Sequence, residues 1–287
     1  MTTNPRRLAR VRPTDPATAA EQFFVASAAT GTGTDGDWTD RDGTWTVIGT
    51  PFPGSAANAS SPWRDSWQLG ATVARDAFCF LAPSAPANVL GMAHNTGPAG
   101  RAQPPQAFHK AATSVVGPGV AIELAPGMRQ VEPEAELAVV IGTTSRGLTL
   151  ATARAAVLGF TIANDVTCRD LQKSDALWIS AKSQDTFTPA GPWITTGLDE
   201  ADLAVGVVLN GKALETASTA DLGWKVDEIL VYLTGFMTLH PGDLVLTGFP
   251  AECRPLSPGD TVACRVEGIG ELVNPVTASA WPGPVPQ

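Results

Sequence analysis

The clearest patterns of hydrophobic and polar residues lie after residue 130. Residues 136–141 (ELAVVI) are almost continuously apolar and are followed by Gly142, which predicts a strand buried on both faces. Residues 160–163 predict a second strand, which ends at Asn164 and Asp165. Residues 244–246 form a third short apolar run, and alternating apolar and polar positions predict a half-buried strand over residues 261–267.

Two helices are predicted among these strands. In residues 226–237 apolar side chains recur at spacings of three and four, which is typical of a helix with one face on a core. A shorter helix is predicted over residues 150–158, with Thr149 as its N-cap and Gly159 just past its end. Because predicted strands outnumber predicted helices, we expect a β-rich α+β fold of packed sheets with peripheral helices.

A change of composition near residue 85 predicts two parts of the chain. Residues 1–84 are rich in Thr, Ala, Gly and Asp, with short apolar stretches at residues 45–48 and 77–81 and a loop-like stretch at residues 51–62. We interpret residues 1–84 as a small N-terminal domain or cap, and residues 85–287 as the main domain. Nearly all of the excess negative charge lies in the second part.

Composition and charge exclude several classes of protein. The 287 residues include 19 Lys+Arg and 28 Asp+Glu, a formal net charge of −9, so we expect no nucleic-acid partner. No apolar run approaches the roughly 18 residues of a membrane-spanning helix. The N-terminus lacks the apolar segment of a secretory signal, so we expect no membrane association and a cytoplasmic location. The widely spaced cysteines are interpreted as reduced and structural: Cys79, Cys168, Cys253 and Cys264.

Two carboxylates stand where the first predicted strand begins. Glu134 and Glu136 are two residues apart, so on a strand their side chains point to the same face. Asp165 ends the next predicted strand, and a neighbouring strand would bring it to the same point. Oxygen ligands of this kind favour Mg²⁺, Mn²⁺ or Ca²⁺ over zinc. The alternative interpretation is a set of solvated charges at a sheet edge.

Six segments, in this order, resemble the fumarylacetoacetate hydrolase family. They are EAELAVVIG at 134–142, NDVTCRDLQ at 164–172, AKSQDTFTPAGPWI at 181–194, NG at 210–211, LHPGDLVLTGFP at 239–250 and GIGELVNPV at 268–276. The resemblance covers roughly residues 85–276. It implies a metal-dependent catalytic domain of rolled mixed β-sheets, preceded by a small N-terminal domain and commonly assembled as a dimer.

The resemblance also implies roles for individual residues. Glu134, Glu136 and Asp165 match the metal-binding carboxylates of the family, which implies Mg²⁺ or Mn²⁺ as the cofactor, with Ca²⁺ as an alternative. Lys182 matches a lysine that holds the metal site or stabilises an enolate. Arg169 and Asp170 are interpreted as a pair that fixes their loop. Positions that match substrate-binding or metal-proximal residues of the family are Gln172, Thr186, Thr247 and Gly248.

The sequence departs from the family at the lid. Family hydrolases carry a histidine and a glutamate there, which serve as the base that activates water. In residues 91–97 the histidine is replaced by Gly97, and His94, three residues earlier, is our candidate catalytic replacement. A structural loop histidine is the alternative. We assign His109 to a packing segment and His240 to a turn.

These assignments imply an enzyme that acts on a small 2-oxo acid through an enolate held on the metal, with Lys182 adding positive charge where the oxyanion develops. Hydrolytic cleavage of a C–C bond is our first expectation. A decarboxylase, isomerase or hydratase that uses the same enolate is the alternative, because the lid dyad is missing. An alternative of a different class is a catalytically silent member that only binds a metal or a ligand. We expect a homodimer.

Overall fold

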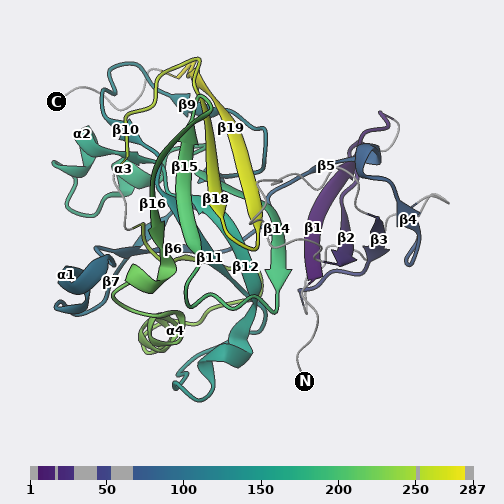
Figure 1. Cartoon of the computed structure of the whole chain (residues 1–287), viewed down its shortest axis with the longest axis horizontal. Coiled ribbons are helices and arrows are strands. Elements are labelled where there is room, and N and C mark those ends of the chain that lie inside the picture. Colours follow the sequence, from purple (N-terminus) through teal and green to yellow (C-terminus); the bar gives the residue numbers. More distant parts are fainter. Residues whose placement is uncertain (1–5, 17–18, 29–43, 53–66, 250–252, 282–287) are drawn as a thin grey trace.

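The computed structural model describes residues 6–16, 19–28, 44–52, 67–249 and 253–281 (Figure 1). Strands dominate the described residues and form one large mixed sheet, a five-stranded sheet and a two-stranded ribbon. Most neighbouring strands are antiparallel, and β17 pairs with β6 in parallel. None of the helices in these ranges has the length and apolar character that a membrane crossing requires.

The large sheet has the strand order β4-β3-β2-β1-β14-β12-β11-β17-β6-β7, with β5 beside β1 and β8 beside β14. Its strands are β1 (Arg6–Pro13), β2 (Phe23–Ala28), β3 (Trp45–Ile48), β4 (Thr72–Val73), β5 (Phe78–Phe80), β6 (Val89–Ala93), β7 (Gln106–Lys110), β8 (Val115–Val116), β11 (Ala135–Ile141), β12 (Val157–Asn164), β14 (Thr188–Thr196) and β17 (Leu244–Leu246).

The five-stranded sheet has the order β16-β15-β18-β19-β9, and β10 pairs with β13 in the ribbon. These strands are β9 (Ile122–Leu124), β10 (Val131–Glu132), β13 (Thr167–Cys168), β15 (Ala204–Leu209), β16 (Lys212–Ser218), β18 (Thr261–Val266) and β19 (Gly270–Ala278). The helices are α1 (Gly97–Arg101), α2 (Arg169–Gln172), α3 (Ile179–Lys182) and α4 (Val226–Thr234), with short 3-10 turns η2 (Arg75–Ala77), η3 (Ala112–Ser114), η4 (Ala153–Ala156) and η5 (Thr219–Asp221).

Strand β11 lies at the centre of the core, because both of its faces are covered. Leu137, Val139 and Ile141 point into the larger core cluster, which also contains buried residues of β15 and β18. Ala138 and Val140, on the opposite face, belong to a second cluster. The predicted doubly buried strand is therefore confirmed, and it offers a rigid support for whatever side chains stand at its first residues.

Part of the N-terminal segment continues the large sheet. Residues Arg6 to Leu8 of β1 pair with β14, and β2, β3 and β4 follow outward, at one end of the molecule's long axis (Figure 1). Trp45 is fully buried, with its ring 6.0 Å from that of Trp193 on β14. The division of the chain at residue 84 stays a prediction, and most of the loop-like stretch at residues 51–62 lies outside the described residues.

The predicted helix over residues 150–158 is wrong. Only the short turn η4 forms there, and Val157 already pairs with Ile141 as the first residue of β12. Gly159 is not a helix cap. It lies inside β12, where an added Cβ would stand 2.5 Å from the carbonyl oxygen of Thr195, so glycine is needed for the close approach of β14.

The other predicted elements form within a few residues of their expected ends. Strand β12 extends the run at residues 160–163 on both sides, whereas β17 and β18 follow the predicted bounds closely. Helix α4 ends at Thr234, three residues before the predicted end, and Gly235 follows it as the C-cap residue in a right-handed conformation. The β-rich class with few helices is confirmed.

Candidate functional site

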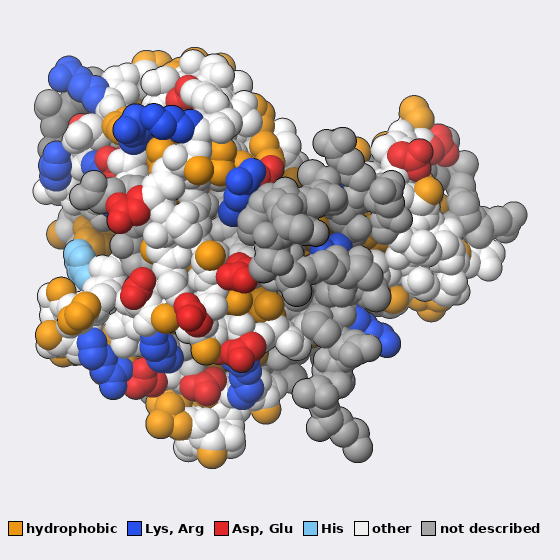
Figure 2. Space-filling model, viewed as in Figure 1, with side chains coloured by type: hydrophobic (Ala, Val, Ile, Leu, Met, Phe, Trp, Pro, Cys, Tyr) orange, Lys and Arg blue, Asp and Glu red, His pale blue; other side chains and the backbone are white. Residues whose placement is uncertain are grey.

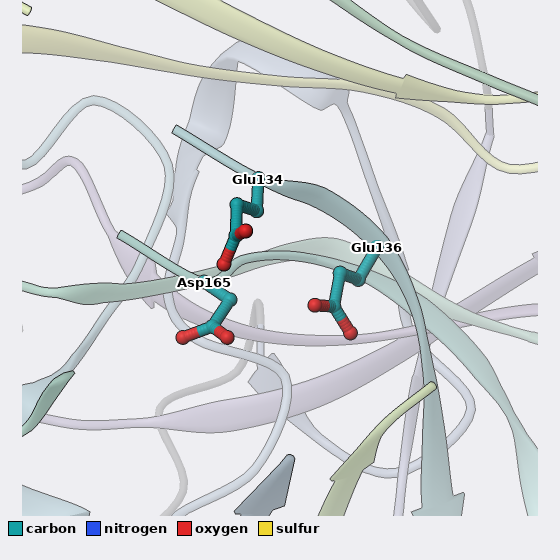
Figure 3. A group of neighbouring side chains, drawn as sticks. All are labelled: Glu134, Glu136 and Asp165. Carbon is teal, nitrogen blue, oxygen red and sulfur yellow. The ribbon is translucent and has the colours of Figure 1, made fainter. Parts of the chain in front are cut away.

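Three carboxylates meet where β11 begins and β12 ends. The two strands are antiparallel with Glu136 opposite Ala163, and the backbone N–H of Asp165 donates to the carbonyl oxygen of Glu134 at 2.9 Å. One oxygen from each of Glu134, Glu136 and Asp165 lies within 4.8 Å of the others, and the three side chains converge from the strand ends (Figure 3). The expected carboxylate cluster therefore forms.

Glu136 is the member of this cluster with the least compensation. It is buried, and its Oε2 accepts a hydrogen bond of 2.5 Å from the backbone N–H of Gly248. Burial, followed by the charges of Asp165 and Glu134, raises the pKa of Glu136 well above its usual range. A cation held between the three carboxylates would oppose all of these effects.

Two basic side chains hold Glu134. Lys182, at the end of α3, donates from Nζ to Oε2 of Glu134 at 2.8 Å and also to the carboxylate of Asp165. Arg169, the first residue of α2, donates to Oε1 of Glu134 at 2.7 Å and to Glu132 at 2.8 Å. Although burial acts in the opposite direction, Lys182 and Arg169 lower the pKa of Glu134 to about 2. Arg169 and Asp170 do not pair as we expected, because Asp170 accepts backbone N–H groups instead.

Lys110 is one of two site residues that sequence reasoning missed. This residue of β7 is fully buried, and its Nζ lies 2.6 Å from Oδ1 of Asp165. Burial is the main cause that lowers its pKa. We assign its neighbour His109 to a packing segment, and the sequence pattern gives Lys110 no role. The one signal in the sequence is the scarcity of lysine, because Lys110 is one of only five lysines in the chain.

The donor set fits a divalent cation. All three groups offer carboxylate oxygen, the ligand that Mg²⁺, Mn²⁺ and Ca²⁺ prefer. Glu136 has no bond to a lysine or an arginine among the described residues, and two further carboxylates lie beside it. Lys110 and Lys182 neutralise part of the remaining charge. Glu134, Glu136 and Asp165 would hold the ion.

A cavity of about 320 Å³ opens above the carboxylates. Of the residues that the sequence singles out, His94, Gln172, Lys182 and Gly248 line it together with the three carboxylates. Thr247 precedes Gly248 in the sequence but does not line the cavity, and its hydroxyl donates to the carbonyl oxygen of Leu137. The structure thus places four of the six candidates outside the carboxylate cluster on the cavity wall.

The candidate Thr186 and the two histidines that we assign to structure stand away from the cavity. Thr186 accepts the backbone N–H of Glu123 at 2.8 Å and does not line the cavity. His109 is exposed on β7. His240 lies in the turn before β17, as predicted, where its backbone N–H donates to the carboxylate of buried Asp243. A substrate role for Thr186 or Thr247 stays a prediction.

One wall of the cavity is aromatic. Phe108 lies under Lys182, with Nζ 4.5 Å from the ring centre, and Trp178 packs against both Phe108 and His94. His94 and Trp178 both adopt left-handed backbone conformations, with φ of 55° and 59°. Such conformations are costly for residues other than glycine and gather at functional sites. Trp178 also caps α3, which carries Lys182.

Buried Asn95 fixes the loop that carries His94. Its Nδ2 donates to the carbonyl oxygens of Thr247 and Trp224 at 2.7 and 3.0 Å, and its Oδ1 accepts the N–H of Trp224 at 2.6 Å. This residue was also missed, because an asparagine in a loop is an ordinary turn residue in sequence. The lid region is thereby bonded to the loop before α4.

Comparison with known proteins agrees with this geometry. The family model "Fumarylacetoacetate (FAA) hydrolase C-terminal" matches residues 78–277. Protein Rv2993c of Mycobacterium tuberculosis is 44% identical over 181 residues, which are 62% of this chain and 68% of that protein. A mitochondrial oxaloacetate tautomerase of Bos taurus is 37% identical over 184 residues, 60% of this chain and 59% of the relative.

A solved structure covers nearly the whole chain. The 5-carboxymethyl-2-hydroxymuconate delta-isomerase from Mycobacterium smegmatis matches with a TM-score of 0.80 and 33% identity, over 95% of this chain and 100% of that one. The family model covers more than half of the sequence, and its match contains all three carboxylates and Lys182. The chain therefore belongs to the fumarylacetoacetate hydrolase family of enzymes.

Proposed function

We propose that this protein is a divalent-metal-dependent isomerase that interconverts the keto and enol forms of a small 2-oxo acid. The observation that carries the proposal is the three-carboxylate cluster with Lys182 bonded to it, in the wall of a cavity whose neighbouring loop has Gly97 in place of the lid histidine. Both keto and enol forms present a carboxylate and an adjacent oxygen to such a site.

The carboxylates of Glu134, Glu136 and Asp165 would hold the cation. When bound, the cation supplies Lewis-acid polarisation of the 2-oxo group and lowers the cost of negative charge on its oxygen. Lys182 places a second positive charge in the same cavity wall, close to where negative charge develops on the 2-oxo oxygen. The N–H of Gly248 keeps Glu136 oriented toward the other two carboxylates.

Tautomerisation also needs a group that moves a proton at C3. His94 lines the cavity, and its ring stands 5.4 Å from that of Trp178. Histidine is the side chain best suited to proton exchange near neutral pH. The left-handed backbone and the Asn95 hydrogen bonds hold this loop in place, so His94 is our candidate for the proton carrier.

The names of two relatives support isomerisation over hydrolysis. One is an oxaloacetate tautomerase and the other a delta-isomerase of a hydroxymuconate. Hydrolytic C–C cleavage, our first expectation from the sequence, needs a base that activates water, and the histidine–glutamate pair of the family hydrolases is absent from residues 91–97. Hydrolysis stays a prediction, and so does a catalytically silent role.

The test follows solvent deuterium exchange at C3 of oxaloacetate and of pyruvate by NMR, with Mg²⁺ or Mn²⁺ present and after removal of metal by a chelator. We expect metal-dependent exchange above the spontaneous rate, without C–C cleavage. Cleavage of an acylpyruvate at a comparable rate would favour a hydrolase. Absence of exchange with every 2-oxo acid tried would favour a silent protein.

A further inference from the structure

The cavity contains a lysine that the proposed chemistry does not use. Lys173 lines the cavity together with Arg169 and Gln172. Lys173 is the C-cap of α2 and has helical φ and ψ, so these three residues stand at positions i, i+3 and i+4 on one face of a single turn. Lysine is rare in this chain, yet three of its five lysines, Lys110, Lys173 and Lys182, belong to this one site.

The three basic side chains of the cavity wall differ in what they already hold. Lys182 is bonded to Glu134 and Asp165, and Arg169 is bonded to Glu132 and Glu134. Lys173 makes no ion pair with a described carboxylate, and its Nζ donates to the neutral Oε1 of Gln130 at 3.1 Å.

Lys173 therefore keeps hydrogen-bonding capacity for a ligand. An ammonium group has three N–H donors, so two remain after the bond to Gln130. The neighbouring carboxylate of Asp170 accepts the backbone N–H groups of Arg129 and Gln130 through one oxygen. These bonds hold the segment that carries Gln130 against the start of α2, which carries Asp170. Lys173 is exposed and lines the cavity.

We propose that Lys173 binds a second carboxylate at the far end of the substrate, so that the enzyme selects 2-oxo dicarboxylic acids over 2-oxo monocarboxylic acids. This inference rests on the proposed function. The 2-oxo end would sit at the three carboxylates, and the carbon chain would pass along Phe108 and Trp178. Lys173 is then a specificity-determining residue, and Gln172, beside it, offers an amide donor to the same group.

The experiment compares substrates of equal chain length, oxaloacetate and 2-oxobutanoate, in the wild type and in Lys173→Gln. The deuterium-exchange rate at C3 gives KM and kcat for each acid, and calorimetry with Mn²⁺ present gives their affinities. Because charge-assisted hydrogen bonds contribute about 1.5–3 kcal/mol, we expect KM for oxaloacetate to rise about tenfold or more in the variant. KM for 2-oxobutanoate and kcat for both acids should stay within about twofold.

Three controls separate this inference from the proposed function. Lys212→Gln, on the exposed strand β16, removes a lysine away from the cavity and should change neither acid. The two directly bonded carboxylates of oxalate would both lie at the metal end, so oxalate offers no further group to Lys173. Its affinity should therefore be the same in Lys173→Gln and wild type. Lys173→Glu should weaken oxaloacetate further than Lys173→Gln does.

An unchanged preference for oxaloacetate over 2-oxobutanoate in Lys173→Gln would overturn the inference while leaving the proposed function intact. An equal loss for both acids would also overturn it. If the wild type exchanges neither acid, the proposed function fails, and the ratio of the two calorimetric affinities still decides whether Lys173 reads a second carboxylate.

Discussion

Glu136 is the residue on which the metal hypothesis depends most. Its carboxylate has no bonded cation among the described residues, and two other carboxylates face it. We expect Glu136→Ala to lower Mn²⁺ affinity at least 100-fold, because the change removes a ligand. The fold should remain, because the change also removes repulsion between buried carboxylates. Calorimetry measures the affinity, and Glu215→Ala on exposed β16 is the control. Unaltered Mn²⁺ binding in Glu136→Ala would remove the hypothesis.

Metal binding should release a proton. The pKa of Glu136 is raised, so this group is neutral below that pKa, and a divalent cation must displace its proton. Glu134, with a pKa of about 2, is ionised throughout the usual range and releases none. Mn²⁺ affinity should therefore fall as the pH is lowered through the raised pKa and level off above it. Titration calorimetry in two buffers with different ionisation enthalpies measures the proton, and equal heats would contradict the expectation.

His94 is the residue that separates a catalytic from a structural loop. If it carries the proton at C3, His94→Gln should lower kcat for deuterium exchange about 10²-fold or more, the range of general acid–base effects, and leave Mn²⁺ affinity unchanged. His109→Gln, on the exposed side of β7, is the matched control. A pH–rate profile that is the same in His94→Gln and wild type would leave His94 as a structural residue packed on Trp178.

At the scale of elements, the loop that carries His94 is held to the segment before α4. Asn95 →Ala would leave the N–H of Trp224 and the carbonyl oxygen of Thr247 without this partner. Buried groups left in this way cost about 1–3 kcal/mol each, so we expect a clear loss of stability and faster amide exchange over residues 91–103. Hydrogen–deuterium exchange measures the second effect. Unchanged protection in that segment would mean that its other contacts hold the loop without Asn95, namely those of Arg101 with Glu228 and Trp224 and the Trp224–Gln103 hydrogen bond.

The elements that could be predicted from sequence are those whose local pattern and tertiary role agree. β11 is buried along its whole length and apolar except at Glu136, and the positions of the carboxylates follow from where this strand begins. Residues 150–158 carried a helix-like cap and glycine, but Val157 and Gly159 serve contacts with β11 and β14 that are distant in sequence. Lys110 and Asn95 were missed for the same reason, because their partners, Asp165 and Trp224, lie far along the chain.

At the scale of the molecule, charged side chains are distributed rather than concentrated on the described part of the face that Figure 2 presents. Figure 2 shows basic side chains interspersed with acidic ones over the larger body of the face it presents. The net charge of −9 thus has no single surface patch on that face. The buried charged residues do not account for it, because Glu136, Asp165 and Asp243 are balanced by Arg7, Lys110 and Lys182. One divalent ion at the three-carboxylate cluster would bring the total to about −7. The homodimer and the cytoplasmic location stay predictions.

The continuous sheet predicts that the N-terminal segment and the metal centre unfold together. β1 pairs with β14, which pairs with β12, and β12 ends at Asp165. Trp45 is fully buried against Phe78 and Trp193, so Trp45→Ala should cost about 3–5 kcal/mol. Because those contacts reach β14, we expect this variant to lower the temperature of the whole transition rather than to create a second one.

Two probes of thermal unfolding test this coupling. Pulse-labelling hydrogen exchange of β1, β2 and β3 follows the strands around Trp45, and loss of bound Mn²⁺, read by its paramagnetic signal, follows the carboxylates. In the wild type and in Trp45→Ala the two midpoints should coincide, since one cooperative unit gives coincident transitions for different probes. If the hydrogen-exchange midpoint of β1, β2 and β3 alone falls in Trp45→Ala while Mn²⁺ release stays at the wild-type temperature, residues 1–84 behave as a separate domain, and the pairing of β1 with β14 is too weak to couple them.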